Sequence, residues 1–125
     1  MNPTEDSFQH VYLLSTELMV SSLIEGYARR HARKYKTCSN LDIFRESLIV
    51  TEKGFAILDL FHLPAPLDEI MQLISSHENL TTLAFAPHVR TELLRQAEEA
   101  GCDLVIPRSQ LDRHLENRFQ QESSR

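Results

Sequence analysis

The chain has 125 residues, a length typical of one domain with a single hydrophobic core. Its 18 acidic residues outnumber its 13 lysines and arginines, and the net charge of -5 argues against non-specific binding to nucleic acid, which requires a basic surface. No apolar run is long enough to cross a membrane, residues 2–7 are polar and unlike a leader sequence, and Cys38 and Cys102 lie outside any cluster with metal-ligand spacing. We therefore expect one cytoplasmic domain over residues 1–125, with a core of about 9–119, that binds no nucleic acid, membrane or structural metal.

The first strand and helix are predicted by a short apolar stretch followed by helix-capping residues. Residues His10–Leu14 have the composition of a strand. Ser15 and Thr16 are both good N-caps, and Glu17 is expected in the first helical turn. A helix should run from Glu17 to about Lys34, because apolar residues recur there at helical spacing. These residues are Val20, Leu23, Ile24 and Tyr27.

A second strand and helix follow directly. The strand is expected over residues 35–38, and Ser39 or Asn40 can cap the next helix. The end of that helix is open to two interpretations. Residues 47–51 have strand-like composition, but a helix running to about Val50 suits the apolar spacing better. The inward face of this helix carries Leu41, Phe44 and Leu48.

Residues 54–64, GFAILDLFHLP, are the stretch around which the chain is organised. The unbroken apolar run is typical of a central strand in a parallel sheet that helices cover on both faces, and we expect it to end at Leu60. Ligands bind at the carboxyl ends of such strands, where the sequence places one carboxylate, Asp59. A buried acid needs a cation, hydrogen-bond donors or water nearby. Asp59 is therefore the leading candidate for a functional residue, with a loop-capping role as the alternative.

The rest of the chain continues the alternation of strands and helices. Strands are expected over residues 81–86 and 104–106. A helix should follow each strand, two of them beginning at Pro87 and Ser109, with Gly101 closing the first of these two. The inward faces of the last three helices are predicted to carry Leu67, Ile70, Met71 and Ile74, then Val89, Leu93 and Ala97, then Leu111, Leu115 and Phe119.

Five strands alternating with five helices through short connections predict an α/β fold. We expect a doubly wound, five-stranded parallel sheet in the flavodoxin-like order 2-1-3-4-5, with helices on both faces. In this order the loops after strands 1, 3, 4 and 5 converge at one end of the sheet. Asp59 and Arg108 should then lie within salt-bridge or water-bridged reach.

This arrangement resembles the receiver domains of two-component response regulators over nearly the whole chain, about residues 10–119. The strongest local matches are ILDL, residues 57–60, followed four residues on by Pro64, and EEAGCDLVIPRS, residues 98–109. The resemblance implies that Asp59 occupies the phosphoacceptor position.

Several positions depart from the receiver pattern. The resemblance puts Ser15 and Thr16 where receivers carry two acidic metal ligands, and only the next residue, Glu17, is acidic. It puts Ala86 where a serine or threonine is usual and Arg108 where a lysine is usual. Two hydroxyls are poor substitutes for the carboxylates that Mg²⁺ prefers. The resemblance therefore implies a degenerate receiver, or pseudo-receiver, that is not phosphorylated in the usual Mg²⁺-dependent way.

Two other classes of function stay open at this stage. A working receiver, phosphorylated on Asp59, would hold Mg²⁺ through Glu17, Asp59 and water. A small flavodoxin-like domain could instead bind a cofactor through the hydroxyls of residues 15–16, although that loop lacks glycine, or act as an enzyme with Asp59 and either His62 or His88 as an acid/base pair.

The preferred function is a stand-alone, non-enzymatic signalling module that acts by protein-protein interaction. We expect a protein partner such as a sensor kinase or regulator, and a homodimer formed through the fourth or fifth helix. No cofactor is expected, and Mg²⁺ only if the working-receiver alternative holds. The basic cluster at residues 29–36 is attributed to solvated cations at a helix end.

Overall fold

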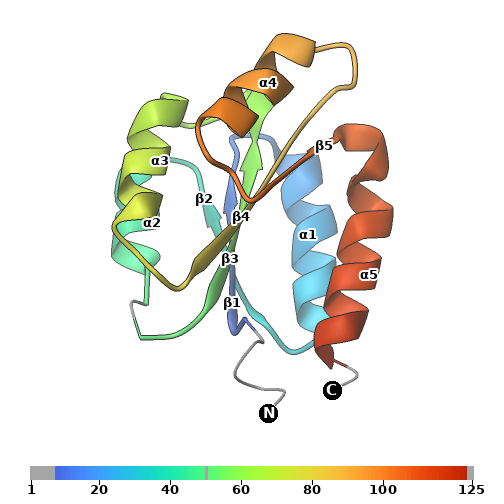
Figure 1. Ribbon diagram of the computed structural model, residues 1–125. Helices are drawn as coiled ribbons and strands as arrows, with labels where there is room; N and C mark the ends of the chain where they lie inside the picture. Colours follow the sequence, from blue (N-terminus) through green and yellow to red (C-terminus); the bar gives the residue numbers. More distant parts are fainter. Residues whose placement is uncertain (1–7, 50, 124–125) are drawn as a thin grey trace.

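Parallel strands in the order β2-β1-β3-β4-β5 form a central sheet between two layers of helices (Figure 1). The strands are β1 (His10–Leu14), β2 (Lys34–Cys38), β3 (Gly54–Asp59), β4 (Leu80–Ala86) and β5 (Leu104–Pro107). The helices are α1 (Leu18–Arg30), α2 (Leu41–Ser47), α3 (Leu67–Ser75), α4 (Thr91–Glu99) and α5 (Leu111–Ser123), with one-turn 3-10 helices η2 (Leu60–His62) and η3 (Arg108–Gln110). This computed structural model describes residues 8–49 and 51–123. Within them it confirms the doubly wound α/β fold and the predicted strand order.

Helices cover both faces of the sheet, and the central strands are buried throughout. Phe55 and Ile57 of β3 pack with residues of α1 and α5. Ala56 and Leu58 face the opposite layer, formed by α2, α3 and α4. Every residue of β1 and β3 is buried. Burial on both faces accounts for the unbroken apolar run of the sequence.

The carboxyl ends of four strands meet at one edge of the sheet. Leu14 pairs with Leu58 across β1 and β3, and the next residue of β3, Asp59, pairs with Phe85 of β4. The last residues of β4 and β5 pair with each other in turn. The loops that follow these strands therefore leave the sheet side by side, as the sequence predicted.

The start of α1 differs from the prediction. Neither Ser15 nor Thr16 caps the helix, because Glu17 is itself the N-cap. Its carboxylate accepts hydrogen bonds from the backbone amides of Met19 and Val20, each at 3.0 Å. The two hydroxyl residues are thereby left for contacts with the neighbouring strand.

Helix α1 also ends earlier than predicted, at Arg30 rather than near Lys34. Ala32 has a φ of 58°, a left-handed conformation that reverses the chain, and Lys34 begins β2. The basic cluster is thus divided between two elements. Arg29 forms an ion pair with Glu25 within α1 at 2.7 Å, and the lysines of β2 are exposed. These residues agree with solvated cations at a helix end, but Arg33 does not, because its Nε is buried and its guanidinium lies over the ring of Phe8.

Helix α2 is capped as one prediction had it but is shorter than expected. Asn40 is the N-cap, and its side chain accepts from the amide of Ile43 at 2.8 Å. The helix ends at Ser47 because Leu48 has an extended backbone, with ψ 128°. Neither a strand over residues 47–49 nor a helix reaching 49 is formed, and Val50 lies outside the described residues.

Two further boundaries were wrong. Strand β3 ends at Asp59, because Leu60 already begins η2. Helix α4 begins at Thr91 rather than at Pro87, whose carbonyl closes a turn with the amide of Arg90 at 2.9 Å. Val89 therefore lies in the loop and is 68% exposed instead of packing inward.

The last helix packs as predicted, although it starts two residues late. Ser109 belongs to η3, and α5 begins at Leu111. Leu111, Leu115 and Phe119 are fully buried. Gly101 follows α4 with a φ of 95°, a conformation that glycine adopts without strain and that suits its predicted role in closing the helix.

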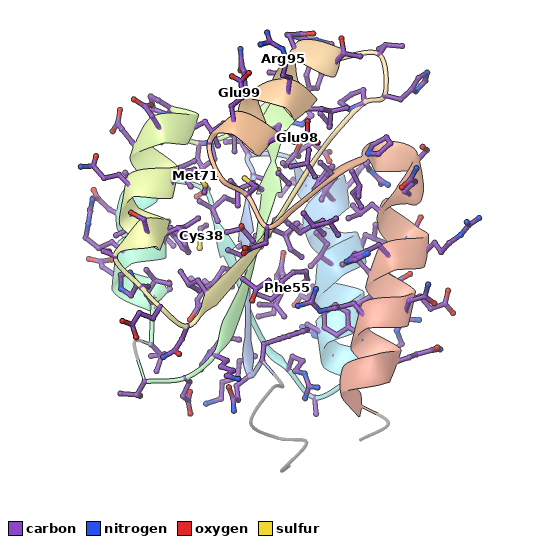
Figure 2. The ribbon with its side chains drawn as sticks, viewed as in Figure 1. Cys38, Phe55, Met71, Arg95, Glu98 and Glu99 are labelled. Atoms are coloured by element: carbon purple, nitrogen blue, oxygen red, sulfur yellow. The ribbon has the colours of Figure 1, made fainter. Side chains whose placement is uncertain are left out.

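The two cysteines are unpaired thiols on the same side of the sheet. Figure 2 shows Cys38 and Met71 on the side of α2 and α3, and Phe55 on the side of α1 and α5. Burial raises the pKa of Cys38 to about 12 and that of Cys102 to about 11. Both are therefore poor nucleophiles at neutral pH. Among the described residues, no helix has the length and apolar character needed to span a bilayer.

Hydrogen bonds between Thr82 and Asp103 join β4 to the turn before β5. The carboxylate of Asp103 accepts from both the amide and the hydroxyl of Thr82, at 2.8 Å and 3.1 Å. The Thr82 hydroxyl accepts in turn from the Asp103 amide at 2.8 Å. Thr82 is 2% exposed, so water does not replace these contacts easily.

We predict that Asp103→Ala lowers the free energy of unfolding by about 2 kcal/mol, because it leaves buried donors of Thr82 unpaired. Asp103→Asn keeps a side-chain oxygen that can accept and should lose clearly less. Urea unfolding followed by circular dichroism measures both. Equal losses in the two variants would contradict the role given to the carboxylate oxygen.

Candidate functional site

Asp59 is the last residue of β3 and lies at the carboxyl edge of the sheet, where the sequence placed it. Despite this position it is only 1% exposed. A carboxylate withdrawn from water to this degree needs hydrogen-bond donors from the protein.

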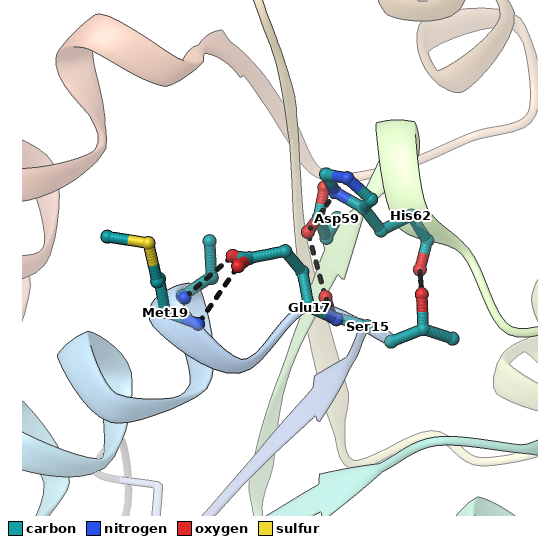
Figure 3. Close-up of polar contacts among 7 residues, drawn as sticks. Ser15, Glu17, Met19, Asp59 and His62 are labelled. Carbon is teal, nitrogen blue, oxygen red and sulfur yellow. Dashed lines mark hydrogen bonds and ion pairs between the residues drawn. The ribbon is translucent and has the colours of Figure 1, made fainter.

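Ser15 and His62 supply those donors (Figure 3). The hydroxyl of Ser15 donates to Oδ2 of Asp59 at 2.8 Å, and Nδ1 of His62 lies 3.1 Å from the same oxygen. Because a carboxylate oxygen accepts, we assign the proton of the second contact to Nδ1 of His62. We call Ser15, Asp59 and His62 the Asp59 clamp.

Further hydrogen bonds join the two loops that carry the clamp. The backbone carbonyl of His62 accepts from the amide of Thr16 at 3.0 Å and from its hydroxyl at 3.4 Å (Figure 3). The hydroxyl of Ser15 accepts from the amide of Glu17 at 3.0 Å. The loop after β1 is thus fastened to η2 by both backbone and side chains.

Glu17 turns its carboxylate to α1 (Figure 3). The amides of Met19 and Val20 are the main reason that its pKa lies below the ordinary glutamate value, with smaller contributions from the charges of His62 and Arg108. As a metal ligand Glu17 would have to give up its role as helix cap. In the described part of the chain, no cluster of three or more His, Cys, Asp or Glu side chains could hold a metal ion.

Arg108 lies at the same end of the sheet, but among the described residues it forms no direct ion pair with Asp59; reach through a water bridge stays a prediction. The side chain in direct contact with Asp59 is the imidazole of His62, an ion pair only when the ring is protonated. The guanidinium of Arg108 lies over the ring of Phe85, with Cζ 6.0 Å from the centroid. Because Ser15 and His62 both bind Oδ2, the buried acid does not depend on a direct contact with arginine.

Ala86 is fully buried at the end of β4 and packs in the core on the α3 and α4 side. It brings no hydroxyl to the site. His88, the other histidine considered from the sequence, lies in the next loop and is exposed. Of the two, only His62 reaches Asp59.

The sequence analysis paired His62 with Asp59 only as an acid/base alternative, and it did not predict that His62 holds the buried carboxylate in place. The available signal was its spacing, since residues three apart lie on the same side of a 3-10 turn. That signal required knowing that η2 begins directly after Asp59. The side chain of His62 remains 39% exposed, and its ring packs edge-on against Phe61 at 5.0 Å.

Receiver domains share this fold. No family model and no curated protein sequence matches the chain. The receiver domain of Ssk1 from Saccharomyces cerevisiae, crystallised with the histidine phosphotransfer protein Ypd1, matches over 94% of this chain and 90% of that chain, with a TM-score of 0.71 and 13% identity. FixJ-N matches over 92% of this chain and 93% of that chain, with a TM-score of 0.69 and 14% identity.

Full-length FixJ from B. japonicum matches over 93% of this chain, with a TM-score of 0.68 and 12% identity, and this chain spans only 60% of its length. At such identities the likeness concerns the fold. The protein has the five-stranded, flavodoxin-like fold of response-regulator receiver domains.

The lowered pKa of Glu17 predicts a pH-dependent contribution to stability. The folded state favours the ionised carboxylate, so the contribution is complete above the ordinary value of 4.5 and is lost as the pH falls through the lower folded-state pKa. Glutamine resembles the protonated form at every pH. We expect Glu17→Gln to be less stable than the wild type at about pH 7, and the difference to vanish on acidification. Urea unfolding at a series of pH values measures the free energy of unfolding of both proteins. A difference between them that does not change with pH would contradict the capping role of the charge.

Proposed function

We propose that this protein is a non-enzymatic signalling module with the receiver fold, which acts by binding a protein partner and not through Mg²⁺-dependent phosphorylation of Asp59. The Asp59 clamp is the observation that carries the proposal. It engages the carboxylate that would have to accept a phosphoryl group.

Access to Asp59 is the first supporting argument. A carboxylate that attacks a phosphoryl group must approach it in line, and the transition state must be neutralised by cations. Asp59 is 1% exposed, and its Oδ2 already accepts two hydrogen bonds. A phosphoryl donor would have to displace the imidazole of His62 before it could reach that oxygen.

The missing acidic pair is the second argument. Ser15 and Thr16 stand where receivers carry acidic ligands, and both hydroxyls already donate, to Asp59 and to the carbonyl of His62. Glu17 caps α1. Mg²⁺ would find one buried carboxylate in place of several, which favours weak binding.

Partner binding is proposed from the fold and from its structural neighbours. The Ssk1 receiver was crystallised with a histidine phosphotransfer protein, which supports a protein partner for this chain as well, such as a sensor kinase or regulator. The net charge of -5 supports a protein over nucleic acid. The homodimer through α4 or α5 and the cytoplasmic location remain predictions.

The proposal predicts that acetyl phosphate with Mg²⁺ adds no phosphoryl group to the protein, and that beryllofluoride with Mg²⁺ leaves the amide NMR spectrum around Asp59 unchanged. Intact-mass spectrometry and amide spectra measure the two outcomes. A mass increase that disappears in Asp59→Asn would support the working-receiver alternative instead.

A matched variant serves as the positive control for phosphorylation in this fold. Ser15→Asp combined with Thr16→Asp restores two carboxylates at the edge of the sheet, and His62→Ala removes the imidazole from Asp59. The triple variant should bind Mg²⁺ and take up phosphate, since charge and access are both supplied. If the wild type and the triple variant were phosphorylated equally, the clamp would not be what prevents the reaction.

A further inference from the structure

Strand β2 is an edge of the sheet, and within the described residues it pairs only with β1. The amide of Lys34 donates to the carbonyl of Gln9 at 3.0 Å, so the backbone groups of Lys34 and Lys36 point toward β1. Successive residues of a strand turn their amides and carbonyls to opposite sides. Those of Tyr35 and Thr37 therefore point to the open edge, where they can pair with another strand.

Hydrogen bonds to α1 hold this edge in place. The hydroxyl of Ser21 lies 2.9 Å from the hydroxyl of Tyr35 and 2.6 Å from that of Thr37. The Tyr35 hydroxyl also donates to the backbone carbonyl of Ser21 at 3.2 Å. An incoming strand would meet an edge that is already ordered, which lowers the entropy cost of binding.

Two lysines lie on one face of the open edge. Lys34 and Lys36 are two residues apart, so both side chains lie on the α2 side of the strand, as buried Cys38 does. Both lysines are exposed, and among the described residues neither forms an ion pair. The sequence of β2, KYKTC, contains no acid to balance them.

A hollow beside the end of α2 leaves the two lysines uncovered. Helix α2 ends at Ser47, and the hollow has a volume of about 350 Å³. Its lining includes Tyr12, Lys34, Lys36, Ser47 and Ile49. None of the described residues that line it carries a carboxylate.

Two charged residues near the strand are already engaged. Glu52 is bound by His10, and this hydrogen bond is the main reason that the pKa of Glu52 lies below the ordinary glutamate value, with a smaller contribution from the charge of Lys34. Arg33, directly before the strand, lies over the ring of Phe8. Neither Glu52 nor Arg33 lines the hollow.

The helices that flank β2 pair most of their acids internally. Glu25 pairs with Arg29 in α1 at 2.7 Å, and Asp42 pairs with Arg45 in α2 at 2.8 Å. Glu46 of α2 is exposed and has no ion pair among the described residues, but it does not line the hollow either. The lysines of β2 are therefore the charges that an added strand meets first.

The same lysines disfavour a second copy of the chain at this edge. Antiparallel pairing of two β2 strands about a two-fold axis normal to the sheet would bring Lys34 and Lys36 of both copies onto one face. Like charges on neighbouring strands destabilise the pairing. A strand with carboxylates at those positions would be attracted instead.

We propose that the open edge of β2 is a docking site for an extended acidic segment of a partner protein. The segment adds a strand to the sheet through the backbone groups of Tyr35 and Thr37, and carboxylates at alternate positions pair with Lys34 and Lys36. This inference rests on the proposed function and specifies its partner by chemistry. In strand addition, main-chain hydrogen bonds supply affinity and alternate side chains supply specificity.

The experiment uses the full chain and a ten-residue peptide in which glutamate alternates with valine or threonine. At saturation, hydrogen exchange measured by NMR should slow at least about tenfold at the amides of Tyr35 and Thr37. The amides of Lys34 and Lys36 face β1 and should change little. A control peptide with lysine in place of every glutamate should bind at least about tenfold more weakly.

Charge variants test the lysines. Lys34→Glu with Lys36→Glu should weaken the glutamate peptide at least about tenfold and strengthen the lysine peptide. Arg95→Glu with Arg113→Glu changes the net charge equally at exposed positions of α4 and α5, and should leave the affinity within about twofold.

N-methylation of the peptide tests the backbone pairing. Alternate amides of an added strand face β2, so methylation of one alternate set should abolish binding and methylation of the other set should be tolerated. Equal binding of the two methylated peptides would reduce the interaction to charge alone and contradict strand addition.

Three further outcomes would overturn the inference. They are unchanged exchange at Tyr35 and Thr37, equal binding of the glutamate and lysine peptides, and protection that rises with protein concentration without peptide, which would assign the edge to a second copy. The phosphorylation assay fails independently of these. An acetyl phosphate adduct on Asp59 contradicts the proposed mechanism but leaves strand addition intact, whereas lost peptide binding without an adduct contradicts this inference alone.

Discussion

The two hydrogen bonds to Oδ2 of Asp59 govern the carboxyl end of the sheet. A carboxylate that is 1% exposed is unfavourable unless protein donors replace its water, and Ser15 and His62 are those donors. Ser15 lies in the loop after β1 and His62 lies in η2. The hydrogen bonds to Asp59 therefore hold both segments in place at once. His62 completes the connection by accepting from Thr16 through its carbonyl. Hydrogen bonds to a single oxygen therefore help to hold the loop after β1 against η2.

The same contacts engage one of the two carboxylate oxygens of Asp59, and the proposed function rests on this engagement. The carboxylate of Glu17, which follows the loop after β1, is bound to the amides of α1. Phosphoryl transfer relies on a divalent cation to neutralise the developing negative charge, and a single buried acid is a weak site for Mg²⁺. At this end of the sheet, the ring of His62 also packs against Phe61, which is 49% exposed. Partner binding is the function that such an arrangement supports best.

The sequence was sufficient for the fold because hydrophobic burial decides it. Strands covered on both faces have continuous apolar sequences, and the helices have apolar residues at regular spacing. These patterns were enough to predict the strand order and the position of Asp59. Contacts that depend on the geometry of local turns could not be predicted from the apolar pattern. The exposure of Val89 reflects a turn before α4, and the pairing of His62 reflects a 3-10 turn after β3. A direct contact of Arg108 with Asp59 did not form, because converging loops do not determine which side chain reaches a buried acid first, and His62 lies only three residues from it.

The contact between His62 and Asp59 can be observed directly by long-range ¹H–¹⁵N NMR of the histidine rings, with exposed His88 as the internal reference. The account predicts that the proton of His62 stays on Nδ1, that this nitrogen gives a signal distinct from Nε2, and that Asp59→Asn shifts it. Ring nitrogens of His62 that average like those of His88, and that do not respond to Asp59→Asn, would show that the clamp does not form and would contradict the account.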